Sequence, residues 1–414
     1  MLNRMICTLA LIAAICLGLS SNSATGQTKA SWDAARKKMV DEYIITCGIK
    51  NQRVIQAMID TLRHEFVPSQ YRKQAYYDSA IAIGEAQTIS SPFIVAYMTE
   101  CLDPQPTDRV LEVGTGSGYQ AAVLGEIVDQ VYTIEIVEEL GRNAAKTLKR
   151  LDYDNVHVRV GDGFQGWPKY APFNKIIATC SPERVPQPLI DQLAEGGLMI
   201  IPVGERYQQS LYLFRKRDGK LESEVLRPTL FVPMTGRAES LRQVQPDPAN
   251  PSILNGNFEL PIGDDGFVQG WYYERQAKLV DDAKAPQGER YVEFKNDDVG
   301  RAAHMLQGFP VDGSKVASLK VTAQVKSELT FPGPSKGDVP LLAISFYDEE
   351  RRDLGVGFLG PFVGTQDWHE EAKLIAVPRQ AKEGIIRIGL FGATGTITFD
   401  AITLEKGSVR PGEK

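Results

Sequence analysis

The fold of this chain is decided by the stretch Val110-Leu111-Glu112-Val113-Gly114-Thr115-Gly116-Ser117-Gly118-Tyr119. An apolar, β-forming segment leads directly into three glycines at alternate positions, and a helical pattern follows from Gln120 to Val128. Glycine allows the backbone to approach a ligand closely, and a helix N-terminus offers unpaired N–H groups to a polar or anionic group. The stretch therefore predicts a strand, a ligand-binding loop and a helix.

The spacing of the glycines indicates which kind of ligand the loop binds. A dinucleotide fingerprint has glycine at its sixth position, and this chain has Tyr119 there. Glu135 ends the next predicted strand, nineteen residues after Gly116, and an acidic side chain at about this distance accepts hydrogen bonds from a ribose. The pattern favours a nucleoside cofactor without a pyrophosphate, namely S-adenosylmethionine. The alternative is a glycine-rich loop that only turns the chain.

Composition excludes several classes of function. The chain has 414 residues, of which 43% are hydrophobic and 24% charged, as in an ordinary globular protein of two or three domains. A net charge of −6 gives no sign of nucleic-acid binding. The four histidines have no metal-ligand spacing, so we expect no zinc chemistry and no metal ligand among the site residues.

The N-terminus has the pattern of a secretory signal. Arg4 supplies a positive charge, residues 6–19 form an uncharged, mostly apolar run, and small or polar residues follow. We expect residues 1–26 to be removed by cleavage before Gln27, which predicts a periplasmic or secreted protein with no stable membrane span. An uncleaved membrane anchor is the alternative.

Three cysteines remain after this cleavage, Cys47, Cys101 and Cys180. So small and odd a number is not a disulfide framework. One bridge among them stays open, and at least one thiol is free or pairs between chains. Cys180 follows a predicted strand, and without a nearby histidine it is better interpreted as a small buried hydrophobe than as a nucleophile.

Downstream of the glycine loop, strands and helices alternate. The predicted strands are 156–160, 175–179 and 198–203, with a helix at 188–193 and two further strands at 210–215 and 225–232. Alternation of this kind predicts a parallel sheet covered on both faces. Helices at 34–45 and from 54 to 62 and a loop-rich stretch at 66–91 precede the loop. We therefore predict an α/β, Rossmann-like domain over residues 27–245.

A different texture begins after residues 245–251, which contain three prolines and predict a stiff linker. Short β-patterned runs separated by turn residues follow, at 316–325, 341–347, 384–390 and 396–404. Long helical periodicity is missing from this part of the sequence. Residues 246–414 are therefore predicted to form an antiparallel β-sandwich of the jelly-roll type.

Several stretches of residues 50–236 carry a family resemblance. They are Phe66-Val67-Pro68, Gly84 with Gln87-Thr88-Ile89-Ser90, Met98-Thr99-Glu100, the glycine loop, Gly161-Asp162-Gly163, Pro188-Leu189-Ile190-Asp191-Gln192-Leu193 and Phe231-Val232-Pro233. With these motifs the chain resembles protein-L-isoaspartate O-methyltransferases over nearly half its length. The Gln-Thr-Ile-Ser segment is specific to that family, whereas the glycine loop marks only the class of methyltransferases.

The resemblance implies roles for particular residues. Ser90 is expected to hold the substrate carboxylate near the methyl donor and to be the catalytic residue, with Thr235 as a second substrate contact. The expected cofactor contacts are Thr88, Ile89, Gly114, Gly116, Glu135, Asp162 and Gly163. Two of these residues have a structural alternative: Ser90 could cap a helix beginning near Pro92, and Asp162 could cap or turn the chain.

The implied activity is methyl transfer from S-adenosylmethionine to the free carboxylate of L-isoaspartyl residues in damaged proteins. An ionised carboxylate needs orientation and no strong base, which fits a site without a catalytic histidine. One alternative is a methyltransferase of the same fold with another acceptor. The other is an extracytoplasmic carbohydrate-binding protein with a disused catalytic domain, since S-adenosylmethionine is made in the cytoplasm.

The C-terminal part resembles galactose-binding-like jelly rolls of carbohydrate-binding modules. The resemblance rests on Ile253-Leu254-Asn255-Gly256-Asn257-Phe258-Glu259, on Gly270-Trp271 and on residues 395–404. Possible glycan binding would use aromatic rings that stack on sugars, and the candidates are Trp271, Tyr272, Tyr273 and Trp368. The alternative is that these aromatic side chains belong to the core and its rim.

Overall fold

The structure, a computed structural model, describes residues 29–263 and 265–407. The predicted signal at residues 1–26 lies outside the described residues. Within them, no helix combines the length and the apolar character needed to cross a bilayer. Cys47, Cys101 and Cys180 are all free thiols, so the structure forms no disulfide among the three.

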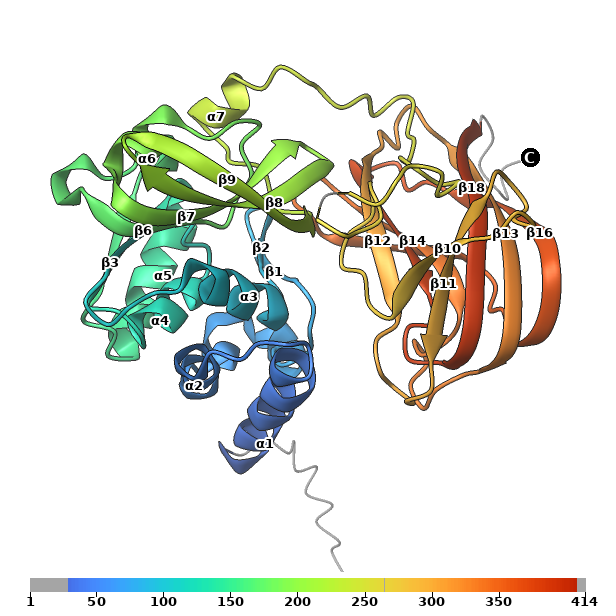
Figure 1. Cartoon of the computed structure of the whole chain (residues 1–414), viewed down its shortest axis with the longest axis horizontal. Helices are drawn as coiled ribbons and strands as arrows, with labels where there is room; N and C mark the ends of the chain where they lie inside the picture. Colours follow the sequence, from blue (N-terminus) through green and yellow to red (C-terminus); the bar gives the residue numbers. More distant parts are fainter. Residues whose placement is uncertain (1–28, 264, 408–414) are drawn as a thin grey trace, which may run out of the picture.

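Two layered parts are joined by an extended segment (Figure 1). We call the first the α/β region, which runs from α1 (Lys29–Met39) to α7 (Arg237–Ser240). The second is the β region, which runs from β10 (Ala277–Asp281) to β18 (Thr394–Gly407). The two regions lie beside each other on the left and right of Figure 1.

The α/β region is built on one sheet. Its strands are β3 (Arg109–Val113), β4 (Gln130–Glu135), β5 (Val156–Val160), β6 (Phe173–Ala178), β7 (Leu193–Glu205), β8 (Gln208–Arg217) and β9 (Lys220–Thr229). They lie in the order β5-β4-β3-β6-β7-β8-β9. Strands β3 to β7 are parallel to their neighbours, and β8 and β9 add an antiparallel edge. The predicted Rossmann-like fold is confirmed.

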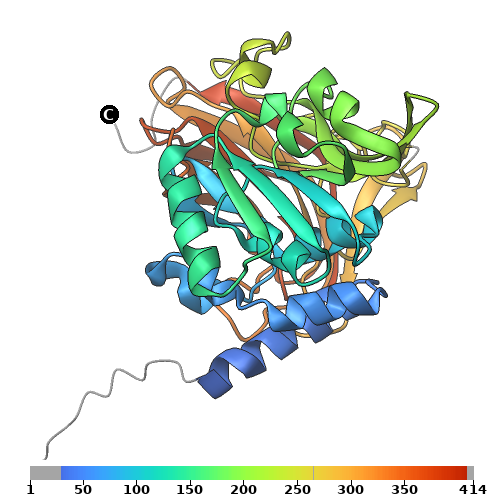
Figure 2. The same cartoon turned by 90° about the vertical axis from the view of Figure 1, so that its left-hand side faces the viewer.

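Helices cover both faces of this sheet. They include α2 (Gln52–Asp60), α3 (Pro92–Leu102), α4 (Tyr119–Gly125), α5 (Glu138–Arg150) and α6 (Gln187–Gln192), with short turns η1 (Val40–Ile45), η4 (Gly163–Gln165) and η5 (Pro168–Tyr170). Successive strand residues point to opposite faces, so Val110 belongs to one apolar cluster and Leu111 to the other. Figure 2 shows the N-terminal helices, in blue, along one side of the sheet.

The stretch predicted to be loop-rich contains short elements. These are η2 (Arg63–Phe66), η3 (Ser69–Gln74) and a hairpin of β1 (Ile81–Gly84) and β2 (Gln87–Ile89). Glu85 and Ala86 make the tight turn of the hairpin with φ of 52° and 56°. The hairpin lies on the side of the α/β region that faces the β region (Figure 1). It therefore carries the Gln-Thr-Ile-Ser segment towards the second half of the chain.

The β region consists of antiparallel strands in two sheets. One has the order β10-β11-β18-β13-β16 and the other β12-β17-β14-β15. Their strands are β11 (Arg290–Asn296), β12 (His304–Pro310), β13 (Ser318–Phe331), β14 (Leu341–Tyr347), β15 (Asp353–Leu359), β16 (Gly364–Ala376) and β17 (Glu383–Gly389). Side chains from both sheets, such as Ile386 and Ile397, belong to one buried apolar cluster.

Two of the aromatic side chains considered for sugar stacking are core residues. Trp271 is 0% exposed and Tyr272 is 1% exposed, and the indole N–H of Trp271 donates to the carbonyl oxygen of Asn255 at 3.1 Å. Stacking on a sugar is therefore wrong for this pair, because neither ring reaches solvent. Trp368 is half-buried and lies edge-on to Tyr291, with ring centroids 5.4 Å apart.

Candidate active site

A cavity opens where β3, β4 and β6 end, and we call it the loop cavity. Its walls come from the glycine loop, from the ends of these strands, from the β1–β2 hairpin and from the segment after β9. The carboxyl ends of parallel strands are where open α/β sheets bind ligands. The cavity therefore lies at the carboxyl ends of the strands, where the sequence predicted a ligand-binding loop.

The glycines of the loop are required by its geometry. Gly114, Gly116 and Gly118 have φ of 102°, 53° and 91°, and residues other than glycine rarely adopt such values. A Cβ atom on Gly114 would also lie 2.5 Å from the Oγ1 of Thr179 on the neighbouring β6 segment. Glycine at position 114 thus allows the loop to pack against the Thr179 side chain, which a larger residue would displace.

Glu135 stands at the end of β4 in the wall of the loop cavity. Its carboxylate accepts hydrogen bonds from the backbone N–H of Gly116 at 2.7 Å and of Val137 at 2.9 Å. Burial raises the pKa of this carboxyl, and the backbone donors oppose the shift. Glu135 therefore fixes the glycine loop to the next strand and offers acceptor oxygens suited to ribose hydroxyls.

The structure brings six of the predicted site residues together. These side chains or backbones line the loop cavity: Thr88, Gly114, Gly116, Glu135, Gly163 and Thr235. Ile89, Ser90 and Asp162 do not line it. Ile89 is a buried side chain of β2, so its expected cofactor contact stays a prediction.

Asp162 has a structural role in the described residues. Its Oδ1 accepts a hydrogen bond from the backbone N–H of Phe164 at 2.9 Å. Its Oδ2 accepts one from the backbone N–H of Arg237, also at 2.9 Å. The carboxylate therefore caps η4 and ties that turn to α7. It holds Gly163 in the cavity wall, and a direct contact between Asp162 and cofactor stays a prediction.

Ser90 is not the cap of a helix. Helix α3 begins at Pro92 with Ser91 as its N-cap residue, and no side-chain hydrogen bond comes from Ser91. The carbonyl oxygen of Ser90 accepts from the buried guanidinium of Arg63 at 2.7 Å. Its hydroxyl makes no hydrogen bond to any residue that the structure describes, and so is available to a ligand.

Sequence reasoning missed several residues of the cavity wall. Gln87, Thr179 and Met234 line it in addition to the predicted set. Thr179 ends a predicted strand beside the glycine loop, and this position could have indicated that it lines the cavity. Cys180 also lines the cavity, and burial holds the pKa of its thiol well above the usual range. The interpretation of Cys180 as a buried, unreactive side chain is thereby supported.

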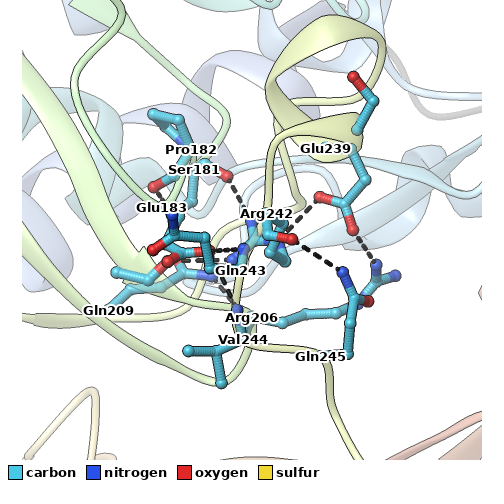
Figure 3. Close-up of polar contacts among 12 residues, drawn as sticks. Ser181, Pro182, Glu183, Arg206, Gln209, Glu239, Arg242, Gln243, Val244 and Gln245 are labelled. Atoms are coloured by element: carbon cyan, nitrogen blue, oxygen red, sulfur yellow. Dashed lines mark hydrogen bonds and ion pairs between the residues drawn. The ribbon is translucent and has the colours of Figure 1, made fainter.

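A buried arginine fixes the segment after β9, as Figure 3 shows. The Arg242 side chain is 1% exposed and pairs with Glu239 at 3.0 Å. It also donates to the carbonyl oxygens of Ser181 at 3.2 Å and Gly204 at 3.1 Å. Ser181 is itself hydrogen-bonded to the backbone of Val232 and Met234. Arg242 therefore positions the stretch that carries Met234 and Thr235 into the loop cavity.

Fold and site together define a class. A glycine loop after the first parallel strand and a carboxylate at the end of the next are the features of a Rossmann-like methyltransferase that uses S-adenosylmethionine. A sequence model of the family "Protein-L-isoaspartate(D-aspartate) O-methyltransferase (PCMT)" matches residues 34–239. This chain belongs to that family.

Curated relatives agree with this assignment. A protein-L-isoaspartate O-methyltransferase of Gloeobacter violaceus is 50% identical over 198 residues, which cover 48% of this chain and 97% of the relative. One of Pelotomaculum thermopropionicum is 50% identical over 202 residues, covering 49% and 88%. Both alignments cover about half of this chain, and the family match ends at residue 239, before the β region.

A solved structure also resembles part of this chain. A Plasmodium falciparum structure, described as a putative protein-L-isoaspartate O-methyltransferase in complex with S-adenosyl-L-homocysteine, is 24% identical. It covers 49% of this chain and 98% of its own, with a TM-score of 0.43.

Proposed function

We propose that this protein transfers the methyl group of S-adenosylmethionine to the free carboxylate of L-isoaspartyl residues in damaged proteins. The observation that carries the proposal is the 50% identity to a protein-L-isoaspartate O-methyltransferase over 97% of that relative's length. In the methyl ester, attack of the backbone nitrogen on the ester carbonyl expels methanol, a far better leaving group than any that the free carboxylate offers. The modified chain can therefore close to a succinimide and partly reopen as normal aspartate.

The loop cavity has the donors and acceptors that this cofactor requires. Glu135 would accept hydrogen bonds from the ribose, and the glycine loop would bring its backbone against the cofactor. When bound, S-adenosylmethionine supplies an electrophilic methyl group on a sulfonium. The acceptor carboxylate is ionised at neutral pH, so the protein has to orient it and exclude water.

Ser90 and Thr235 are proposed to hold that carboxylate, with Ser90 as the catalytic residue. Thr235 lines the loop cavity, and the Ser90 hydroxyl has no partner among the described residues. Thr88, Ile89, Asp162 and Gly163 complete the proposed cofactor set, together with the glycines and Glu135.

Methyl transfer from radiolabelled cofactor to an isoaspartyl peptide, with the matched aspartyl peptide as control, tests the activity. We expect label only in the isoaspartyl peptide. Equal labelling of both peptides would point to another acceptor, and no labelling of either would contradict the proposal.

Ser90→Ala tests the site. We expect a large fall in kcat on the isoaspartyl peptide with cofactor affinity unchanged, because the hydroxyl touches the acceptor and not the cofactor. Titration calorimetry measures the affinity. An unchanged kcat would show that Ser90 has no part in catalysis.

We propose further that residues 1–26 are a cleaved export signal, which would place the protein in the periplasm or outside the cell. The uncharged run at 6–19 after Arg4 supports this proposal. N-terminal sequencing of protein recovered from outside the cytoplasm should find Gln27 as the first residue. An intact N-terminus would contradict it.

For the second half we propose a galactose-binding-like jelly-roll domain of residues 246–414, after a methyltransferase domain of residues 27–245. The contacts of Arg242 to Gln245 with the α/β region support this boundary (Figure 3). Glycan binding remains a second candidate function, supported by the half-buried Trp368 beside Tyr291. Trp368→Ala should weaken retention on polysaccharide, and equal retention of both proteins would remove the candidate.

A further inference from the structure

A second cavity, of about 270 Å³, lies between the α/β region and the β region, and we call it the interregion cavity. Thr88, Ser91 and Leu230 line it from the α/β region, and His304, Tyr347 and Arg387 line it from the β region. Thr88 also lines the loop cavity. The two cavities therefore meet at the hairpin that carries the Gln-Thr-Ile-Ser segment.

The wall between the regions is held by an ion pair. Asp78 accepts from the backbone N–H of Phe93, at the start of α3, at 2.9 Å, and pairs with Arg275 at 3.0 Å. The Arg275 guanidinium also lies 4.2 Å from the centre of the Phe93 ring. The side chains of Arg275 and Asp78 are 15% and 14% exposed. The β region is thus fixed against the N-terminus of α3.

One face of the smaller sheet of the β region supplies the opposite wall. On β17, Ile386 and Ile388 belong to the apolar core, and the alternate residues Ile385 and Arg387 line the interregion cavity. This alternation follows from the two-residue period of a strand. Arg387 therefore points away from its own core and towards the α/β region.

The charges in this cavity are unbalanced. Arg275 pairs with Asp78, and Arg351 makes two hydrogen bonds to the Glu383 carboxylate, at 2.9 and 2.6 Å. Arg387 donates to the hydroxyl of Ser345 at 2.9 Å, and no carboxylate of residues 29–263 or 265–407 forms an ion pair with it. A half-buried guanidinium without a counter-ion favours binding of an anion.

A second unsatisfied group lies in the same wall. The buried Nδ1 of His304 has no hydrogen-bond partner among the described residues. Burial, together with the charges of Arg387 and Arg275, lowers the pKa of this imidazole to about 4. The ring is therefore neutral at pH 7, and its Nδ1 atom can form one hydrogen bond with a polar ligand. Arg387 remains the charged group without an ion-pair partner among the described residues.

We propose that the interregion cavity binds the acceptor peptide and that Arg387, contributed by the β region, pairs with a second carboxylate of that peptide. The inference rests on the proposed function and makes acidic isoaspartyl segments the preferred substrates. Arg387 does not line the loop cavity. It thus lies apart from the carboxylate that is methylated, whose nucleophilicity an ion pair would reduce.

The test compares amidated isoaspartyl peptides that carry glutamate one, two or three positions from the isoaspartate, each matched by a glutamine peptide. The proteins are full-length wild type, Arg387→Met, Arg387→Lys and the control Lys320→Met. Lys320 is on β13 of the other sheet and its side chain is 56% exposed. Cofactor affinity of each protein, measured by calorimetry, shows whether its α/β region is intact.

For wild type we expect kcat/KM to be about ten-fold or more higher for the glutamate peptide than for its match at one of these positions, the scale of a hydrogen bond to a charged group. The preference should come from KM, disappear in Arg387→Met, survive in part in Arg387→Lys and stay complete in Lys320→Met. Cofactor affinity should be equal in all four proteins.

Two results would overturn the proposal: a wild type that does not distinguish glutamate from glutamine at any position, or a preference that survives in Arg387→Met. If no isoaspartyl peptide is methylated by wild type that binds cofactor, the proposed function itself fails. Fluorescence anisotropy of labelled peptides then still decides whether Arg387 binds the acidic ones.

Discussion

At the scale of single residues, two carboxylates near the glycine loop do different work. Glu135 ends β4 in the loop cavity, where its oxygens face backbone donors and a ligand site. Glu112 lies inside β3 and is 0% exposed, with Thr133 as its hydrogen-bond donor and no partner for its Oε1. The first lines a cavity, and the second is buried within the sheet, where it is hydrogen-bonded to Thr133 of the neighbouring strand.

Glu135→Ala should weaken S-adenosylmethionine binding by about 1.5–3 kcal/mol, the range for hydrogen bonds to a charged group. The expected cause is loss of the acceptor oxygens that we propose bind the ribose. Titration calorimetry measures this loss, and Glu135→Gln, which keeps one acceptor, should lie between the two proteins. Equal affinity of wild type and Glu135→Ala would contradict the assignment.

Glu112 should make stability depend on pH. Burial raises the pKa of its carboxyl to about 8 from an ordinary 4.5. The folded state therefore binds a proton more tightly than the unfolded state. The resulting stabilisation is complete below pH 4.5 and is lost as pH rises through about 8.

Glu112→Gln has no proton to lose, so its stability relative to wild type should rise between pH 5 and about 8 and then level off. Urea unfolding at fixed pH values from 5 to 9 follows this difference. A difference that is constant over the range would mean that Glu112 is not protonated in the folded protein.

At the scale of elements, the stretch after β9 depends on residues outside it. Met234 and Thr235 line the loop cavity, and the polar contacts of Arg242 fix the backbone that carries them (Figure 3). Arg206 pairs with the same Glu239 carboxylate at 3.1 Å, but its side chain is 37% exposed. The two arginines form a matched pair for mutation.

Arg242→Met should lower the free energy of unfolding by about 2 kcal/mol or more, since it removes the hydrogen bonds of a buried guanidinium to Ser181 and Gly204 together with its ion pair to Glu239. Arg206→Met should cost less than about 1 kcal/mol because its pair is exposed to solvent. Urea unfolding and cofactor affinity are the measurements. Equal losses in the two variants would show that burial of Arg242 is not what matters.

Elements with a strong apolar pattern were predictable from the sequence. The strands at 156–160 and 341–347 have the predicted bounds, since valine alternates with polar residues in the first and the second is a mostly apolar run. β16 was missed because most of its side chains are exposed and polar. A helix beginning near Pro92 was considered, but not the group that satisfies its first N–H donors: Phe93 donates to Asp78, which no local pattern links to it.

Of the candidate site, sequence identified the glycine loop, Glu135 and Thr88, which belong to contiguous motifs. It did not identify Arg242 or Arg387, because each acts on a part of the chain far away in sequence. Trp271 shows that a motif can also mislead. It lies in a motif typical of glycan-binding modules, but its side chain is fully buried here.

At the scale of the whole molecule, the segment that leads into the β region packs against the α/β region. Tyr273, from the segment before β10, packs against the core of the α/β region, and Arg227 of β9 lies 5.0 Å from the ring of Phe267. The linker with three prolines therefore leads into a contact surface. The β region, which follows the residues 34–239 matched by the family model, is placed beside the β1–β2 hairpin of the α/β region.

A double-mutant cycle on Arg275→Met and Asp78→Asn measures this contact. We expect a coupling energy of about 1–3 kcal/mol in the free energy of unfolding, because both side chains are largely buried and in contact. Differential scanning calorimetry of the full chain gives the four values. Additive effects would show that the pair contributes nothing to holding the regions together.

Thr88 stands in the walls of both cavities, and this has a thermodynamic consequence. If an occupant of one cavity moves Thr88, the surface that an occupant of the other cavity meets also changes, and the two binding equilibria are then linked. Linkage is reciprocal: the factor by which cofactor tightens an acceptor peptide must equal the factor by which that peptide tightens cofactor. A substrate recognised far from the sulfonium, by Arg387, would thereby help to retain the methyl donor until transfer occurs.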